Sequence, residues 1–203
     1  MHPSVFIGKS PQELAIEFGS EETVREMISL AAINAICQHV MRATDFPVDH
    51  ATDSLGLITV SPGDKIGMVG LFSSIVKKIK KVGAGLVVIE KKEILIQKFS
   101  DLPIILDPSK LATCNKILCT STTILNNSLD DILVHCSPDA FVSIIGPTAG
   151  YFPDPLFARG VDVVGGRVVK NGAKFLQKLV ERKRWGETTQ RTCFQKATYT
   201  GII

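Results

Sequence analysis

The fold is set by three stretches of sequence that each read as a buried strand entering a turn. Residues 65–72 read Lys-Ile-Gly-Met-Val-Gly-Leu-Phe, residues 116–123 read Lys-Ile-Leu-Cys-Thr-Ser-Thr-Thr, and residues 141–148 read Phe-Val-Ser-Ile-Ile-Gly-Pro-Thr. Short apolar runs of this kind are typical of strands buried in a parallel sheet. If the three strands lie parallel, their turns meet at the carboxyl edge of the sheet, where open α/β sheets bind ligands.

The sequence around these stretches alternates between short apolar runs and segments with helical periodicity. This alternation predicts a βαβ series, and hence an α/β protein with a parallel sheet and helices on its faces. The predicted strands are 65–69, 85–89, 116–119 and 141–145, with further strands at 161–164 and 167–169. The predicted helices are 72–81, one capped by Asp107 with Pro108 in its first turn, 123–134 and 171–183.

An amino-terminal helix is predicted from Ser20, which is a good cap before Glu21 and Glu22, to about Met41. Asn34 is the polar exception within its Ala-rich middle. Residues 42–62 are rich in Asp, Pro and Gly, which predicts an irregular connection and a domain boundary near residue 60. The apolar residues that fall on one face of the helix are Val24, Met27, Ile28, Ala31, Ala35 and Ile36.

Composition indicates a globular protein: 45% of the 203 residues are hydrophobic and 21% are charged, which is enough apolar material for a buried core. There is no run of about 18 apolar residues and no signal-peptide pattern at the start, so we expect a cytoplasmic protein without a membrane anchor. The five cysteines are odd in number and scattered, which predicts reduced core thiols.

The charge of the chain is uneven. Residues 1–169 carry 15 basic and 18 acidic side chains, whereas residues 170–203 carry 8 basic and 2 acidic ones. The basic segment 174–185 is an amphipathic helix of a type that can meet nucleic acid or lipid. Because the rest of the chain is acidic and contains no known nucleic-acid-binding motif, we expect no nucleic-acid partner.

Two neighbouring turns carry candidate ligand-binding residues. Gly67 and Gly70 let a strand enter a helix with little side chain in the way, so an anion could approach the helix amides, although both could serve only a tight turn. Glu90 follows the next strand, twenty residues after Gly70, which is the spacing of the ribose-binding acid in dinucleotide folds. The alternative is a solvated charge beside Lys91 and Lys92.

Two further turns carry polar or rigid segments. Thr120-Ser121-Thr122-Thr123, followed by Asn126 and Asn127, offers more hydroxyls and amides than helix capping requires. The loop of residues 146–155 contains three prolines, and rigid loops on a scaffold often carry function, although this loop could be structural. Metal ligation is weakly indicated, because only Cys119 is expected near the crevice.

With these segments the chain resembles the heavy-metal chelation domain family, long known only as a domain of unknown function. The resemblance extends from about residue 20 to 170. It implies a Rossmann-like domain, residues 61–203, paired with an amino-terminal domain similar to that of enolase, with a site between them. Family members have a longer amino-terminal region of strands, so residues 1–60 are expected to form a reduced, helical remnant of that domain. The matching stretches are 30–35, 63–72, 88–90, 120–123 with Asn126, 145–148, 156–162 and 165–166.

The motifs and the family resemblance lead to three alternative hypotheses for the function. The first is binding of a small anionic or nucleotide-like molecule, or of a metal complex, with no reaction assigned. The second is the handling of a heavy-metal ion or metal cofactor, and the third is an accessory subunit whose site has decayed. The residues expected to line the site are Asn34, Gly70, Phe72, Glu90, Thr120, Thr122, Thr123, Asn126, Gly146, Pro147 and Thr148.

Two expectations concern assembly and substitution. The Ala-rich helix face has little of its own chain to cover it, which predicts a homodimer. Gly70, Thr122 and Gly146 are expected to face one pocket, bordered by Glu90. On this prediction Gly146→Val would block ligand binding sterically and leave the fold largely intact.

Overall fold

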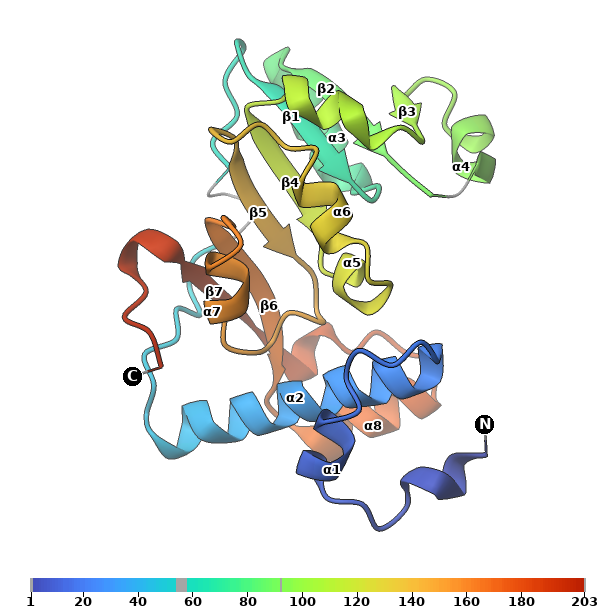
Figure 1. Ribbon diagram of the computed structural model, residues 1–203, viewed down its shortest axis with the longest axis vertical. Helices are drawn as coiled ribbons and strands as arrows, with labels where there is room; N and C mark the ends of the chain where they lie inside the picture. The colour runs from blue at the N-terminus through green and yellow to red at the C-terminus, as the bar shows by residue number, and fades with distance from the viewer. Residues whose placement is uncertain (1, 54–57, 92, 203) are drawn as a thin grey trace.

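The computed structural model describes residues 2–53, 58–91 and 93–202, and its centre is a seven-stranded sheet (Figure 1). The strand order is β3-β2-β1-β4-β5-β6-β7, and every neighbouring pair is parallel except β6 and β7. The first six strands therefore have the order of a Rossmann fold. The strands are β1 (Lys65–Val69), β2 (Gly85–Ile89), β3 (Ile104–Ile105), β4 (Lys116–Thr120), β5 (Phe141–Ile145), β6 (Val163–Val169) and β7 (Thr189–Gln195).

The predicted parallel pairing of the four central strands is confirmed. β1 pairs with β2 on one side and β4 on the other, and β5 pairs with β4. Alternate residues of these strands point to opposite faces. Met68 and Leu118 belong to one core cluster, whereas Val69, Ile117 and Cys119 belong to the other.

Helices cover both faces of the sheet, as predicted. The helix α3 (Ser73–Val82) buries Val76 and Ile79 in the core on one face. The opposite face is covered by the 3-10 helix η2 (Pro108–Thr113) and by α6 (Leu129–Leu133) and α7 (Asp154–Phe157), which bury Leu111, Ile132 and Leu156. Each covering element therefore contributes an apolar stripe to a core shared with the sheet.

Several helix predictions need correction. The segment 123–134 is two short helices, α5 (Thr122–Leu125) and α6, because Asn127 takes a left-handed conformation with φ of 51° that interrupts the turn between them. The element capped by Asp107 is the 3-10 helix η2 rather than an α-helix. The last predicted helix is α8 (Gly172–Val180), which ends three residues early. The helix α4 (Glu93–Lys98) was not predicted.

The strand predictions near the carboxyl terminus were incomplete. The two segments predicted at 161–164 and 167–169 form one continuous strand, β6. The antiparallel strand β7 was missed because its sequence, Thr-Gln-Arg-Thr-Cys-Phe-Gln, is mostly polar. It lies at the edge of the sheet, where one ladder partner is sufficient and polar residues are tolerated.

The long helix α2 (Thr23–Ala43) differs from the prediction at its start and in its buried face. Its cap residue is Glu22, and the Ser20 hydroxyl accepts a hydrogen bond from the Glu22 amide at 3.2 Å instead. The face that packs on the core carries Leu30 and Met41. On the predicted face Val24, Met27, Ala31 and Ala35 are exposed, while Ile28 and Ile36 are partly buried. The homodimer stays a prediction, as does the domain boundary, whose segment includes residues 54–57 outside the described residues.

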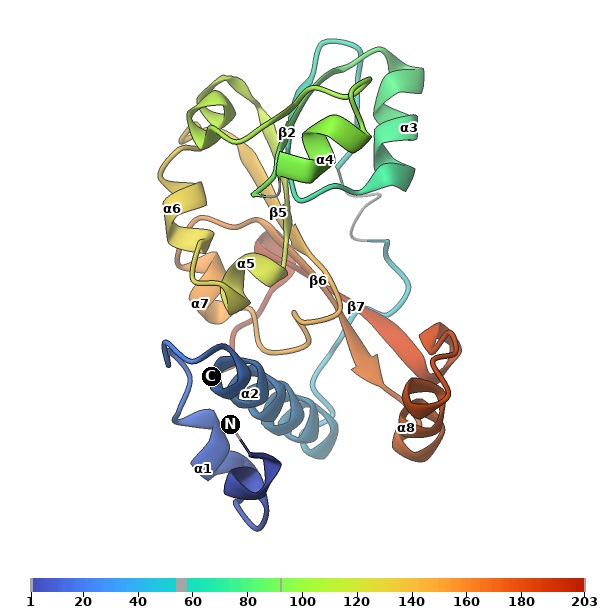
Figure 2. The same ribbon diagram turned by 90° about the vertical axis from the view of Figure 1, so that its right-hand side faces the viewer.

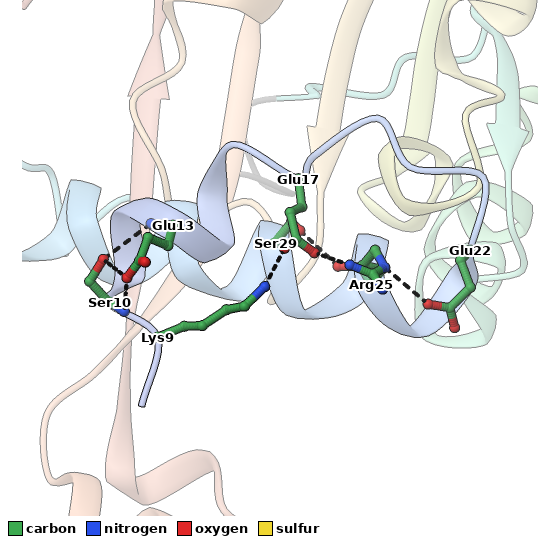
Figure 3. A network of polar contacts seen from close by, with 7 residues as sticks. All are labelled: Lys9, Ser10, Glu13, Glu17, Glu22, Arg25 and Ser29. Atoms are coloured by element: carbon green, nitrogen blue, oxygen red, sulfur yellow. Dashed lines mark hydrogen bonds and ion pairs between the residues drawn. The ribbon is translucent and has the colours of Figure 1, made fainter. Parts of the chain in front are cut away.

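The helix α1 (Pro11–Ala15) and the residues after it lie beside α2 and are joined to it by polar contacts (Figure 3). The helix α1 begins with a capping box between Ser10 and Glu13, and it follows the 3-10 helix η1 (Pro3–Phe6). Glu17 accepts hydrogen bonds from Lys9 at 2.6 Å and from Arg25 of α2 at 2.7 Å. These two cations lower the pKa of the Glu17 carboxyl.

The helix α2 runs across the end of the sheet toward which β4 and β5 point, so it lies at the carboxyl edge (Figure 1). Figure 2 shows that β6 and β7 extend beyond the other strands as far as α8. The chain reaches β7 through the 3-10 helix η3 (Gly186–Thr188) and ends beyond η4 (Lys196–Thr198). Across the described residues, no helix combines the length and apolar character needed to span a bilayer.

Candidate functional site

A crevice of about 690 Å³ lies at the carboxyl ends of β1, β2 and β4. Its polar side comes from the turns that follow these three strands, and its apolar side comes from residues such as Leu95, Leu106 and Pro108. Seven of the eleven predicted site residues line it, namely Gly70, Phe72, Glu90, Thr120, Thr122, Thr123 and Asn126. The topology therefore brings these turns together, as the parallel arrangement requires.

The turn after β1 is closed by contacts that use its first amides. Gly70 has a φ of 83°, and its amide donates to the Ile89 carbonyl at 3.0 Å. The Leu71 amide donates to Glu90 Oε1 at 2.8 Å, and the Phe72 amide contacts Met68 Sδ at 3.4 Å. The glycine turn is thus unavailable as a phosphate cradle of the kind that was expected, because its amides already have partners.

The start of α3 leaves other amides open. The helix has Phe72 as its cap and no side-chain cap hydrogen bond, and the Ile75 amide returns to the Phe72 carbonyl. The amides of Ser73 and Ser74 make no hydrogen bond to any residue that the structure describes. These two donors lie at the positive end of the helix dipole.

The threonines after β4 are of two kinds: one has a hydroxyl that is bonded to the backbone, and the others have hydroxyls that can bond a ligand. Thr123 is 3% exposed, and its Oγ1 donates to the Thr120 carbonyl at 2.8 Å, so this hydroxyl holds the turn. Thr122 is exposed, and its Oγ1 lies 3.0 Å from Thr120 Oγ1. Asn126 Oδ1 accepts from the Ser128 hydroxyl at 2.5 Å. Thr120 and Thr122 are therefore the pair whose hydroxyls can turn toward a ligand.

Gly146 does not line the crevice with Gly70 and Thr122, so the common pocket expected for these three residues does not form. Gly146 has a φ of 149°, and a Cβ atom there would overlap Ser121 Oγ. That hydroxyl bonds Thr148 Oγ1 at 2.6 Å and ties the two turns together. The substitution Gly146→Val would therefore disturb the fold, contrary to the prediction that it would act on the ligand alone.

The three other predicted residues, Asn34, Pro147 and Thr148, line a second hollow of about 640 Å³ between α2 and β6. Asn34 Nδ2 donates to the Leu30 carbonyl at 2.9 Å and to the Thr148 carbonyl at 3.0 Å, which fixes the loop after β5 to α2. We call this hollow the groove. The helix α5 contributes Thr122 and Thr123 to the crevice and Leu125 to the groove, so it stands between the two.

Sequence reasoning missed several residues of the crevice. Leu95, Leu106 and Pro108 form its apolar wall, and Asp131 adds a second carboxylate, besides that of Glu90, to its lining. The sequence predicts Asp131 within a helix over 123–134 and gives no signal that it belongs to the site. In the structure the break at Asn127 separates α5 from α6, and Asp131 of α6 lines the crevice.

The thiols are poor candidates for soft-metal ligands. Burial raises the pKa of Cys119 to about 12 and those of Cys136 and Cys193 to about 11, which disfavours the thiolate form that binds metals. No three His, Cys, Asp or Glu side chains of the described residues come together as a metal-binding group. The donor set that the structure describes therefore does not fit a resident heavy-metal ion.

Comparisons with known proteins identify the relatives of the chain. A family model, DUF364, described as "Putative heavy-metal chelation", matches residues 53–197. A protein of unknown function from this family in Pyrococcus horikoshii is 22% identical, with a TM-score of 0.77 over 91% of this chain and 74% of its own. One from Desulfitobacterium hafniense is also 22% identical, with a TM-score of 0.72 over 91% and 73%. No protein with a curated description matches.

Proposed function

We propose, from the premise that this chain belongs to the DUF364 family, that it binds a nucleotide-like small molecule in the crevice at the carboxyl edge of its sheet. The observation that carries the proposal is the position of Glu90, which directly follows β2 in a Rossmann strand order and lines the crevice. An acid at this place in dinucleotide-binding folds accepts hydrogen bonds from the ribose hydroxyls.

Glu90 has the capacity that this role requires. Its Oε1 atom holds the turn after β1 by accepting the Leu71 amide. A carboxylate has four acceptor sites on two oxygens, so Oε2 can accept from a ligand while Oε1 keeps the turn in place. The anchored oxygen fixes the orientation of the carboxylate before a ligand arrives, which lowers the entropic cost of binding.

The remainder of the crevice suits the other parts of such a ligand. Phe72, Leu106 and Pro108 offer apolar surface to a base, and the hydroxyls of Thr120 and Thr122 offer hydrogen bonds to its polar edge. Ser73 and Ser74 do not line the crevice themselves, but they directly follow Phe72, which does, and their open amides can receive a single anionic group at the start of α3. The cavity volume of about 690 Å³ lies in the usual range of small-molecule sites.

The sharpest test compares two nucleosides and two forms of the protein. Adenosine and 2′,3′-dideoxyadenosine are titrated into the wild-type chain and into Glu90→Ala by calorimetry, after native mass spectrometry has identified any co-purifying molecule. A lost hydrogen bond to a charged group costs about 1.5–3 kcal/mol, so each single change should weaken binding about tenfold or more.

The combination of the two changes decides the result. If Glu90 binds the sugar hydroxyls, the variant binds both nucleosides equally, because the partner of the hydroxyls is already gone. Lys77→Gln on the exposed side of α3 is the control and should bind adenosine as the wild type does. The proposed function would be contradicted if removing the sugar hydroxyls weakened binding equally in the wild type and in Glu90→Ala. It would also be contradicted if the wild type bound none of adenosine, guanosine and their monophosphates.

The family description favours a second candidate, in which a heavy-metal ion is bound as cargo. The ion would reach the crevice as part of an organic complex, since Glu90 and Asp131 supply only two carboxylates there. Elemental analysis of the purified chain separates this candidate from the first. Stoichiometric metal that is lost in the Glu90→Ala and Asp131→Ala variants would support it.

A further inference from the structure

The groove between α2 and β6 gathers positive charge from three separate segments. Arg42 comes from the last turn of α2, Arg167 from β6, and Lys170 from the residue after β6. No Asp or Glu is among the residues that line this hollow, and Asp45 borders the neighbouring hollow beyond Arg42. Charges of one sign inside a concave surface reinforce one another and attract the opposite charge.

These three cations differ from several others in the molecule, which are paired with acids. Lys116, Arg25 and Arg159 each have an acidic partner within 4.0 Å. No such partner occurs for the groove cations anywhere in residues 2–53, 58–91 and 93–202. The groove therefore keeps a local excess of positive charge that the fold itself does not neutralise.

Arg167 is also held in position before any ligand binds. Its Nη1 atom donates to Thr189 Oγ1 at 2.8 Å, and its guanidinium lies 6.0 Å from the centre of the Trp185 ring. The residue is half-buried, and these two contacts leave several of its five donors free. A planar guanidinium fixed in this way is suited to bidentate bonding with a phosphate or carboxylate.

The start of α8 adds backbone donors at the same place. Gly172, its first residue, lines the groove, and the Asn171 side chain caps the helix by accepting from the Lys174 amide at 3.0 Å. The Gly172 and Ala173 amides make no hydrogen bond to another described residue. A Cβ atom on Gly172 would have no neighbour within 4 Å, so the helix start has open space around it.

We propose that the groove is an anion site that binds the phosphate group of a small molecule, separate from the crevice. Three unpaired cations and two open amides form a donor set that matches a multiply charged oxyanion. A volume of about 640 Å³ fits a small molecule. This site does not depend on nucleoside binding at Glu90, because α5 separates the two hollows.

The test uses inorganic pyrophosphate, titrated by calorimetry into the full chain at low salt, with malonate as a carboxylate of similar charge separation. Arg167→Gln should weaken pyrophosphate binding about tenfold or more, since a charge-assisted hydrogen bond is lost. Gly172→Asp places a carboxylate at the groove and should abolish binding. The acid favours the start of a helix, so this variant should fold at least as well as the wild type.

Two matched controls make the outcome decisive. Gly172→Asn has the same shape without the charge and should keep pyrophosphate binding, and Lys77→Gln on α3 removes an exposed charge elsewhere and should also keep it. The proposal is overturned if wild-type protein does not bind pyrophosphate, if Gly172→Asp binds it normally, or if Lys77→Gln loses as much affinity as Arg167→Gln. Malonate binding as tightly as pyrophosphate would overturn the assignment to phosphate. A negative result for pyrophosphate in the groove would leave the test of adenosine binding at Glu90 unchanged. The two proposals can therefore be refuted independently.

Discussion

The two edges of the sheet use similar polar residues in opposite ways. At the amino edge the Asp64 carboxylate accepts from the Ser61 amide at 2.6 Å, from Asn115 Nδ2 at 2.9 Å and from Lys116 Nζ at 2.7 Å. At the carboxyl edge Glu90 accepts one amide, and the Ser73 and Ser74 amides at the start of α3 make no bond to a described residue. The Asp64 carboxylate at the amino edge is bonded within the protein, whereas the polar groups at the carboxyl edge can still form hydrogen bonds to a ligand.

This difference separates residues that hold the fold from residues that can hold a ligand. A carboxylate with three protein partners contributes to stability and has little to offer a ligand, whereas one with a single anchor is oriented and still available. Substitutions at the amino edge should therefore lower stability, and those at exposed positions of the carboxyl edge should lower only affinity. Gly146 is the test of this distinction, because it is a carboxyl-edge residue with structural contacts.

The largest expected effect is at Asp64, which is 9% exposed. Asp64→Ala removes three hydrogen bonds and leaves Lys116 without its ion-pair partner, so we expect a loss of about 3 kcal/mol in the free energy of unfolding. Urea denaturation measures it. Asp101→Ala breaks an ion pair between two exposed side chains, Lys80 and Asp101, and should cost less than about 0.5 kcal/mol. Similar losses for both would remove the contrast between the edges.

Gly146→Ala should come next, with a loss of about 2–3 kcal/mol, because it combines an unfavourable φ with a clash at Ser121. Gly172→Ala is the matched control, since the Cβ atom there meets open space at a helix start. That variant should be as stable as the wild type or slightly more stable. Thermal melting of the two proteins shows whether Gly146 is structural, and a melting temperature unchanged by Gly146→Ala would argue against this assignment.

The acid sensitivity of the chain should depend on Asp64. Its pKa is lowered to about 2, first by the hydrogen bond from Lys116 and then by the Ser61 amide. The pKa in the unfolded chain is roughly 3.9, so this group stabilises the fold above that pH, and the contribution of about 2 kcal/mol is lost as the pH falls toward 2. In Asp64→Asn the same fall in pH should cost less stability, as measured by denaturation at a series of pH values. An identical pH dependence in both proteins would assign the effect to other acids.

The sequence predicted the central strands because their residues are buried on both faces. The apolar run of β1 has the same bounds in the prediction and in the structure, and β4 differs by one residue. The edge strand β7 could not be found in this way, since its polar residues are tolerated with a single neighbour. The buried face of α2 was also missed, because apolar residues occur on several sides of this helix and only packing selects among them.

The sequence predicted several of the individual residues of the candidate site but not how the predicted residues are divided between two hollows. Parallel strands place their turns at one edge, so the shared position of Gly70, Glu90 and Thr122 followed from the pattern of the chain. The separation of Asn34 and Thr148 into a second hollow depends on how α2 and the extended β6 pack, which are contacts over more than 100 residues of sequence. The bond from the Leu71 amide to Glu90 likewise has no local sequence signal.

The smallest change in stability is expected at Thr122, and it sharpens the comparison within a single turn. Thr122 is exposed at the crevice, whereas the neighbouring Thr123 is 3% exposed and donates to the Thr120 carbonyl at 2.8 Å. Thr123→Val should cost about 1 kcal/mol of stability through the lost hydrogen bond. Thr122→Val should change stability by less than about 0.5 kcal/mol and weaken adenosine binding about three- to tenfold. Denaturation and calorimetry on both variants measure the two quantities, and because the substitutions are chemically identical and adjacent, the comparison isolates the burial and hydrogen bonding of the two hydroxyls. A loss of stability in Thr122→Val that equals its neighbour's would mean that this turn is structural throughout and that the crevice has no free hydroxyl there.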